Sequence, residues 1–276
     1  MFAILFPNIN PIAVDLGLVS IHWYGISYII SIVLGSFILK IIDQKYRVVG
    51  FYSKDIEILI SYIIIAIIIG GRLGYVIFYT PNIIVNNFLE IFKVWNGGMS
   101  FHGGLIGVII SIWMYSLQYN KKFLLLTDLV ACVAPIGCFI GRMANFINGE
   151  LYGRITNVSW AVIFPIYDYQ PRHPSQIYEA IFEGIILFII MIVALHIKNY
   201  IASQDNTEKI YYHNNGLLSG IFLVFYSIFR STIEFVREPD SHIGYFYYSF
   251  TLGQILCIPM IILGIILIVN VSIKRK

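Results

Sequence analysis

The chain has 276 residues, of which 58% are hydrophobic and only 12% are charged, and its mean hydropathy is +0.80. Soluble globular proteins carry about 25% charged residues, so this composition excludes a soluble enzyme and a disordered chain and predicts an integral membrane protein. The net charge is +3 and the longest basic run is residues 274–276, which together exclude a nucleic-acid-binding protein.

Seven apolar stretches are each about as long as a helix that crosses the hydrocarbon core, which takes roughly 20 residues. The predicted spans, in chain order, are residues 20–42, 56–79, 98–118, 125–147, 179–197, 216–236 and 246–272. Turn and charge signals such as Asn214-Asn215-Gly216 separate them. We therefore expect an all-α polytopic protein with seven transmembrane helices, forming a single integral membrane domain over residues 1–276.

The basic residues predict the orientation of these spans, because loops rich in Lys and Arg stay in the cytoplasm. Eleven of the 18 basic residues fall on one side, four on the other and three inside spans. This places the N-terminus outside and the C-terminus in the cytoplasm. The apolar stretch of residues 2–6 ends at Pro7 with no basic residue before it, so we do not expect a cleavable signal peptide.

Charged groups inside a membrane span cost about 2.5–3.5 kcal/mol on insertion scales, so they usually mark a function. With the predicted orientation, nearly all such groups and several tyrosines fall in the outer third of the membrane. They are Tyr24, Arg72, His102, Arg142, Glu179, Glu183, Tyr226, Arg230 and Glu234. Asp128 is the exception, at the cytoplasmic start of the fourth span, where a helix-capping role is expected.

The spacing of Tyr226, Arg230 and Glu234 places them on one helix face, and Arg142 and Asn145 also share a face. An isolated Arg230–Glu234 pair would be purely structural. One glutamate does not neutralise two arginines, however, and guanidinium groups bind phosphate oxygens in a two-point fashion. These residues therefore favour a phosphate site at the outer leaflet, with a phospholipid headgroup as the natural ligand.

Glycines form three small-xxx-small spacings, at Gly70 and Gly74, at residues 103 and 107, and at residues 137 and 141, which predict close helix packing. The glycine-rich run of residues 96–104 predicts irregular backbone lining a cavity. This run would present His102 near the arginines, where it can act as a base near neutral pH.

The sequence contains no motif for a metal or a nucleotide. A His-Glu-x-x-His pair, a Walker loop and paired aspartates are absent, and residues 98–102 fall short of Gly-x-Ser-x-Gly. Cys132, Cys138 and Cys257 have no metal-binding spacing and are interpreted as buried apolar residues. We expect no metal and no cofactor.

Residues 141–154, GRMANFINGELYGR, resemble the signature of the prolipoprotein diacylglyceryl transferases, although Ala144 and Tyr152 depart from residues common there. Further matching segments follow the same order in the chain. They are residues 23–25 (WYG), 102–107 (HGGLIG), 172–179 (RHPSQIYE), Tyr226 through Arg230 to Glu234, and 237–240 (REPD). Seven spans with an outside N-terminus are also typical of that family.

The resemblance implies that the diacylglyceryl group of phosphatidylglycerol is transferred to the lipobox cysteine thiol of a prolipoprotein signal peptide in the bacterial inner membrane, with release of glycerol phosphate. It implies His102 as base, Arg142 and Arg230 as phosphate ligands, and a small extracytoplasmic head at residues 148–175. The resemblance further implies that Glu150 and Glu234 orient the arginines. It implies that Tyr24, Asn145 and Tyr226 form hydrogen bonds with headgroup oxygens, and that Gly153 permits a tight turn.

Two other functions remain open on the residues alone. A phospholipid or organic-anion transporter also needs arginines inside a helical bundle, but inverted repeats would favour it. Residues 71–74 and 141–144 are alike, but they lie in two spans that run in the same direction, so they are not an inverted repeat. A lipid-binding relative without activity would lack His102 or one of the arginines, and the sequence keeps them all.

Overall fold

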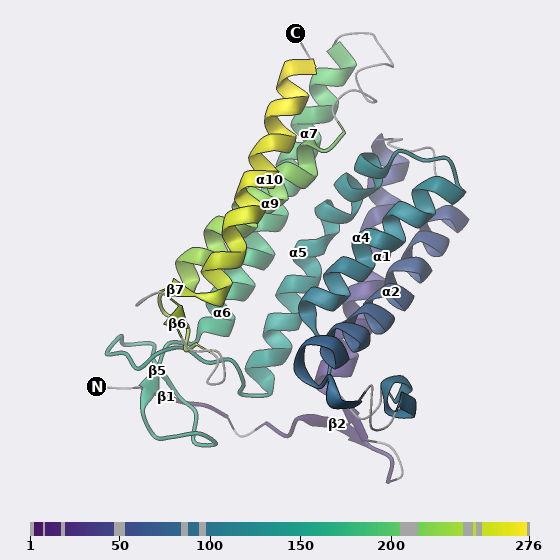
Figure 1. Cartoon of the computed structure of the whole chain (residues 1–276). Helices are drawn as coiled ribbons and strands as arrows, with labels where there is room; N and C mark the ends of the chain where they lie inside the picture. The colour runs from purple at the N-terminus through teal and green to yellow at the C-terminus, as the bar shows by residue number, and fades with distance from the viewer. Residues whose placement is uncertain are drawn as a thin grey trace. The chain divides into compact units, whose positions relative to one another are not determined.

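A computed structural model describes all residues except 1–2, 8, 18–19, 47–52, 84–87, 94–97, 205–214, 240–244, 247–249 and 275–276. The described chain is mostly helical, with short strands in its connecting segments (Figure 1). Its contacts divide it into two compact units. One comprises residues 1–38 and 128–276, and the other comprises residues 39–127.

Among the described residues, five helices are long and apolar enough to cross a membrane. They are α1 (Trp23–Tyr46), α2 (Ser53–Tyr79), α5 (Phe123–Ile147), the continuous helix formed by α6 (Ser175–Glu179), η3 (Ala180–Ile186) and α7 (Leu187–Gln204), and α10 (Leu252–Lys274). Two further apolar helices, α4 (Phe101–Gln118) and α9 (Leu217–Ile233), are shorter. The helical, membrane-spanning character expected from the sequence is thus present.

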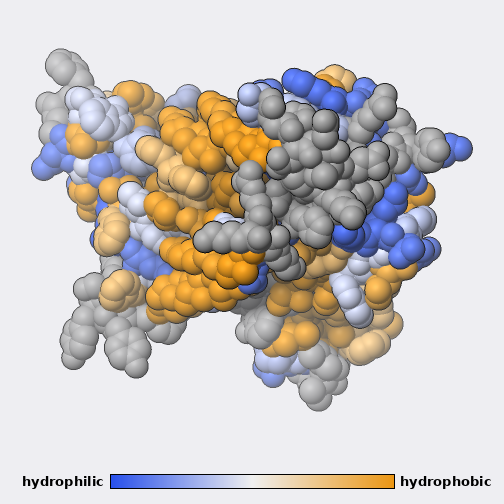
Figure 2. Space-filling model, turned by 90° about the horizontal axis from the view of Figure 1, so that it is seen from above, coloured by the Kyte–Doolittle hydropathy of each residue, from blue (hydrophilic) through white to orange (hydrophobic). Residues whose placement is uncertain are grey.

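The helices expose large apolar side chains that a soluble protein would bury. Ile29 on α1 is 63% exposed, Leu117 on α4 is 65% exposed and Ile273 on α10 is 65% exposed. Figure 2 shows hydrophobic residues gathered over the surface in that view. Helices that are apolar all round are typical of membrane spans, because lipid covers their outward faces.

In the unit of residues 39–127, α2 and α4 pack closely through glycines, as their spacing predicts. A Cβ atom at Gly74 would lie 2.7 Å from the Cα atom of Gly103, and one at Gly107 would lie 2.5 Å from the carbonyl oxygen of Ala66. Small residues let helix backbones approach where lipid supplies no hydrophobic force between helices. The expected approach at residues 137 and 141 is not found, since a Cβ there would meet no described atom within 4 Å.

The start of α4 differs from the expected irregular backbone. Ser100 caps the helix, because its Oγ accepts a hydrogen bond from the backbone N–H of Gly103 at 3.2 Å. The helix therefore begins at Phe101 and includes His102 in its first turn. Gly98 has φ +78° just before the cap. Gly103, which follows the cap, packs against α2, and residues 96–97 of the glycine-rich run lie outside the described residues.

Replacing Gly103 with alanine is expected to destabilise this helix pair. The new methyl group would meet the backbone of Gly70, which cannot move aside as a flexible side chain can. Overpacking of this kind costs about 1–3 kcal/mol, and the midpoint of thermal unfolding in detergent should fall. Gly104→Ala is the matched control, since its methyl group would lie 3.8 Å from the carbonyl oxygen of Ile67, an ordinary van der Waals contact. Equal unfolding midpoints for the two variants would contradict the packing described.

In the other unit, glycines join two further helix pairs. A Cβ at Gly220 on α9 would lie 2.8 Å from the carbonyl oxygen of Gly264 on α10, and these helices lie side by side (Figure 1). A Cβ at Gly184 in η3 would lie 2.6 Å from the Cβ atom of Phe139 on α5. The second approach brings α5 against the helix that carries Glu179 and Glu183.

Asp128, near the start of α5, connects three helices. Its Oδ2 atom lies 2.9 Å from Nζ of Lys198 on α7 and accepts a hydrogen bond from the backbone N–H of Gly216. Its Oδ1 atom accepts bonds from the backbone N–H and the hydroxyl group of Ser219, each at 2.8 Å. The capping role expected for Asp128 is therefore exerted on the N-terminus of α9, and not on its own helix.

The connecting segments form small sheets. β2 (Ile12–Asp15) pairs antiparallel with β3 (Ser20–His22) before α1. β1 (Ile4–Leu5) pairs parallel with β4 (Val162–Ile163), and β4 pairs antiparallel with β5 (Pro171–Arg172). The N-terminal segment is thus tied to residues 148–175, and Phe6 packs against Phe164 beneath this sheet.

The predicted span boundaries agree with the helices to within four residues except at two places. The fifth span is predicted to end at residue 197, whereas α7 continues to Gln204. The other exception is the start of the last span. There the sequence predicts a start at residue 246, whereas α10 begins at Leu252. The reason is that β6 (Tyr245–Phe246) pairs antiparallel with β7 (Phe250–Thr251), which uses the backbone groups that a helix would need. A short 3₁₀ helix, η1 (Phe88–Phe92), follows α2.

Candidate active site

Three arginines and three glutamates meet inside the unit of residues 1–38 and 128–276. We call this set the arginine–glutamate cluster. Its members are Arg142 on α5, Glu179 on α6, Glu183 on η3, Arg230 on α9, and Glu234 and Arg237 in the turn after α9. These residues are far apart in the sequence. They come together because α6 and η3 contact α9, and because Gly184 allows α5 to approach η3.

Glu179 is the centre of the cluster, because its carboxylate contacts all three arginines. Its Oε1 atom pairs with Nη1 of Arg230 and lies 2.9 Å from Nη1 of Arg237. Its Oε2 atom lies 3.3 Å from Nη1 of Arg142. A carboxylate with three guanidinium neighbours fixes the positions of all three.

The other two carboxylates hold the arginines from the sides. Glu234 Oε2 lies 2.9 Å from Nη2 of Arg230. Glu183 is held more loosely, with Oε2 at 3.4 Å from Nη2 of Arg142 and Oε1 at 3.9 Å from Nη1 of Arg230. Tyr226, one turn before Arg230 on α9, interacts electrostatically with Glu183 and both arginines.

Burial differs within the cluster, because Arg142 and Arg230 are more exposed than Arg237, which is 6% exposed, and than the three glutamates. The side chains of Glu179, Glu183 and Glu234 are 0%, 1% and 6% exposed, whereas those of Arg142 and Arg230 are 19% and 14% exposed. The carboxylates thus form the closed floor of the site, and two guanidinium groups form its open edge. Donors held in fixed positions at a partly dry edge suit an oxyanion such as a phosphate.

The helix that carries the two central glutamates has an irregular geometry. Residues Ala180–Ile186 form a π-helix between α6 and α7, and such segments are rare and often occur at functional sites. Gly184 lies within it, directly against Phe139. The π-helix therefore coincides with the close approach of α5 and with the carboxylate of Glu183.

Asn145 lies one turn after Arg142, and its Nδ2 donates a hydrogen bond to Oε1 of Glu150 at 2.8 Å. Glu150 also accepts a longer bond from Asn148 and, through its backbone carbonyl, a bond from the buried Gln176. The described contacts of Glu150 are thus with amide side chains, whereas the resemblance implies that it orients an arginine. Glu234 does contact an arginine directly.

Gly153 lies where two other segments cross closely. A Cβ there would be 2.6 Å from the carbonyl oxygens of both His173 and Val236. Its backbone N–H bonds His173, and it forms a bridge with Arg237. Glycine is required here by the close approach of neighbouring chain, and not by a tight turn, since its φ is not in the left-handed region.

Two arginines anchor residues 148–175 to the end of α9. Arg154 donates to the carbonyl oxygens of Arg237 and Glu234, at 2.9 and 3.3 Å. Arg172 reaches Glu238 at 3.4 Å and also pairs with Asp168 at 2.6 Å, which lowers the pKa of the Asp168 carboxyl group. These contacts hold the turn that presents Glu234 and Arg237 to the cluster.

The remaining predicted residues lie outside these contacts. Tyr24 on α1 is 39% exposed, and its described contacts are with Ser27 and Tyr28. His102 belongs to the unit of residues 39–127, and its side chain lies outside the described residues. Arg72 is buried and donates to the carbonyl oxygens of Glu90, Ile91 and Gly98, which is a structural role.

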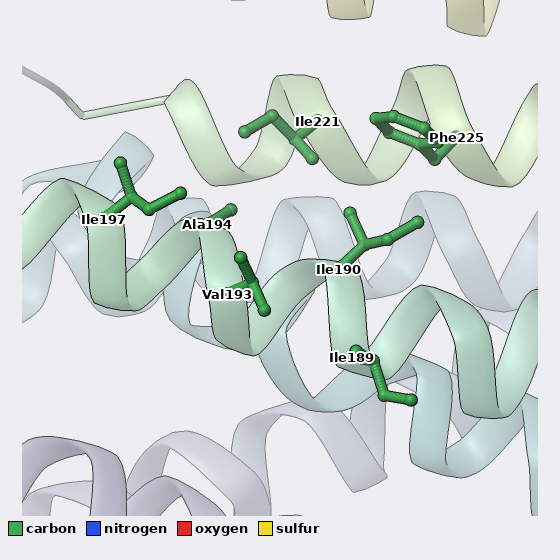
Figure 3. Close-up of a pocket in the computed structure, with 7 residues that line it drawn as sticks. All are labelled: Ile189, Ile190, Val193, Ala194, Ile197, Ile221 and Phe225. Carbon is green, nitrogen blue, oxygen red and sulfur yellow. The ribbon is translucent and has the colours of Figure 1, made fainter.

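An apolar groove runs along α7 and α9, the same helices that lead away from the cluster. It has a volume of about 320 Å³. Its lining consists of Ile189, Ile190, Val193, Ala194, Ile197, Ile221 and Phe225. In Figure 3, Ile190 and Ile197 point from α7 toward α9. Because these lining side chains are all apolar, the groove provides no catalytic group, but it suits a hydrocarbon ligand.

Several members of the site are absent from the set predicted as functional. Glu179 and Glu183 are recognised in the sequence only as charges at the outer third, and Arg237 and Arg154 only as parts of matching segments. A signal for the first two exists, because two glutamates four residues apart on an apolar helix need basic partners. No group of three or more metal-ligating side chains occurs among the described residues.

The fold and the cluster define a helical membrane protein with a buried arginine–carboxylate site. A family model described as prolipoprotein diacylglyceryl transferase matches residues 11–270, and the chain belongs to this family. Relatives named phosphatidylglycerol–prolipoprotein diacylglyceryl transferase cover almost all of it. The protein of Rickettsia felis is 50% identical over 95% of this chain and 97% of its own length. Those of Rickettsia canadensis and Rickettsia typhi are 49% and 50% identical over 98% of this chain and their full lengths.

Proposed function

We propose that this chain is a transferase that moves the diacylglyceryl group of phosphatidylglycerol to a prolipoprotein cysteine. The observation that carries the proposal is the pair of partly exposed arginines, Arg142 and Arg230, at a closed carboxylate floor in a chain of this family. Full-length identity of about half to relatives named for this reaction supports it. The expected substrates are phosphatidylglycerol and a signal peptide that carries the lipobox cysteine.

The reaction forms one carbon–sulfur bond and breaks one carbon–oxygen bond. The cysteine sulfur attacks the glyceryl carbon that bears the phosphate, the thiol proton goes to a base, and glycerol phosphate leaves with the electron pair of the broken bond. A thiol with a pKa of about 8.5 is mostly protonated near neutral pH, so a base accelerates the attack. We assign this base to His102.

The leaving glycerol phosphate gains negative charge, which Arg142 and Arg230 stabilise at the edge of the cluster. Glu234 and Glu179 hold Arg230 in place. Asn145, held by Glu150, offers a hydrogen bond to headgroup oxygens, as do Tyr24 and Tyr226. No metal takes part in this mechanism.

We further propose seven spans in the bacterial inner membrane, with the N-terminus outside, the C-terminus in the cytoplasm and residues 148–175 as an extracytoplasmic head. The unequal distribution of basic residues supports this orientation. All members of the cluster lie at the ends of spans that approach the head, so the site would face the outer leaflet.

A cytoplasmic reporter enzyme fused after residue 276 should be active, and the same reporter inserted between residues 157 and 169 should be inactive. The reason is that the C-terminal side carries most of the Lys and Arg residues. Activity of reporters in intact bacteria measures this directly. The reverse pattern would overturn the orientation and the outer-leaflet position of the site.

Transfer is expected to continue in EDTA, because arginines and not metal ions stabilise the leaving phosphate. The measurement is the rate of thioether formation with and without chelator, using purified protein and phosphatidylglycerol. Loss of transfer that added Mg²⁺ or Zn²⁺ restores would contradict this mechanism.

The decisive experiment combines purified protein, phosphatidylglycerol vesicles and a lipobox peptide. The proposal expects a peptide whose mass increases by one diacylglyceryl group, together with free glycerol phosphate. A transporter would instead move phospholipid across the bilayer and leave the peptide unchanged. Such a result would replace the transferase by the transporter.

A further inference from the structure

The six side chains of the arginine–glutamate cluster carry no net charge when all of them are ionised. Three guanidinium groups face three carboxylates, and the side chain of each of the three glutamates is at most 6% exposed. A phosphodiester bound at Arg142 and Arg230 would add one negative charge to this balanced and mostly buried set. An unbalanced charge in a low-dielectric site is strongly unfavourable. A proton taken up by one carboxylate would restore the balance.

Glu183 is the carboxylate best placed to take up this proton. Its two ion-pair distances, 3.4 and 3.9 Å, are the longest in the cluster. Glu179 and Glu234 each keep at least one arginine contact at 2.9 Å or shorter. One buried carboxylate oxygen of each glutamate has no hydrogen-bond partner among the described residues, so the ion-pair distances are what distinguish Glu183. Protonation of Glu183 therefore costs less ion-pair attraction to the arginines than protonation of Glu179 or Glu234 would.

Charged and titratable groups on every neighbouring element face Glu183, and most of them resist titration near neutral pH. Arginine stays protonated, and tyrosine and cysteine stay neutral, in this range. These neighbours are Cys138 and Arg142 on α5, Glu179 on α6, Tyr226 and Arg230 on α9, Cys257 on α10, and Arg237. Apart from Glu183, the only neighbour among them able to gain a proton is Glu179, which three arginines hold ionised.

We propose that Glu183 is a positioning residue that takes up a proton from solution when a phospholipid headgroup binds Arg142 and Arg230. The identity of the headgroup rests on the proposed function. The protonated carboxyl group no longer competes for the guanidinium groups, which turn their free N–H donors to the phosphate oxygens. When glycerol phosphate leaves, Glu183 loses the proton and the cluster returns to its balanced state.

The first test is the affinity of the purified full-length protein for phosphatidylglycerol in detergent micelles, from about pH 5.5 to about pH 8.5. Uptake of one proton makes the dissociation constant rise with pH, by up to about tenfold per pH unit where Glu183 titrates. In Glu183→Gln, which is neutral at every pH, the dissociation constant should not change with pH. Glu238→Gln, an exposed carboxylate outside the cluster, should keep the wild-type slope.

The second test identifies the protonated group itself. The infrared difference spectrum on adding phosphatidylglycerol should gain the band of a protonated carboxyl group in the wild-type protein. This band should shift in Glu183→Asp and disappear in Glu183→Gln. Diacylglycerol, which has no phosphate, should not produce it. Thermal unfolding of each variant checks that it is folded.

A dissociation constant independent of pH in the wild-type protein would overturn proton uptake. A slope that persists in Glu183→Gln, or a band unchanged in Glu183→Asp, would overturn the assignment to Glu183. Transfer to a lipobox peptide is measured separately on the same wild-type preparation. Failure of transfer with intact proton-linked binding would reject the proposed function alone, and pH-independent binding with intact transfer would reject only this inference.

Discussion

Lysine in place of Arg142 or Arg230 is expected to lower the rate of diacylglyceryl transfer at least about tenfold while the protein still accumulates in the membrane. Lysine keeps the positive charge but offers a single point of contact, whereas guanidinium presents a planar pair of donors to a phosphate. We expect Arg142→Lys to be the more severe, because the side chain of Arg142 is the more exposed of the two.

The measurement is the initial rate of thioether formation, normalised to the amount of folded protein. Arg72→Lys is the control for replacing a buried arginine, since Arg72 bonds backbone carbonyl groups outside the cluster. Its loss of rate should stay below tenfold. Rates near wild type for both cluster variants would reject phosphate recognition by these arginines, and poor accumulation of both would favour a purely structural role.

Glutamine in place of Glu179 is expected to destabilise the protein by about 3–5 kcal/mol, the usual cost of removing one partner from a buried ion pair. The substitution removes the one carboxylate that contacts all three arginines of the cluster. Three guanidinium groups would then share two carboxylates. Thermal unfolding in detergent and the amount of protein in membranes both measure the loss.

Glu183→Gln is the matched control for this prediction, because both glutamates lie on the same helix, one turn apart, and both are buried. The looser contacts of Glu183 predict less than half of the destabilisation. Equal unfolding midpoints for the two variants would show that the contact distances do not rank these carboxylates.

The sequence predicts the helices well, because each one is an apolar stretch of nearly the length that a bilayer demands. It places the start of the last helix about six residues too early, at residue 246 where α10 begins at Leu252. Hydropathy does not register the pairing of β6 with β7, since strand residues and span residues are equally apolar. The parallel pairing of β1 with β4 joins segments too distant for a local pattern to reveal.

The site is predicted in part. Arg230 and Glu234 are four residues apart on one helix face, and their contact follows from that spacing. The contact between Glu179 and Arg237 depends on how two separate segments fold together, and no spacing encodes it. Gly153 shows the same limit, because the segments that cross it, at His173 and Val236, are remote in sequence.

The cap that Asp128 provides has a consequence for how the protein is made. A ribosome synthesises Asp128 70 residues before Lys198 and 88 residues before Gly216. During that interval α5 carries a carboxylate whose later partners on α7 and at the start of α9 have not yet been synthesised. The end of α5 that bears Asp128 must therefore stay in contact with water, or with the insertion machinery, until α7 and the start of α9 emerge. Assembly of these three helices is thus completed late in translation, when α9 receives its cap.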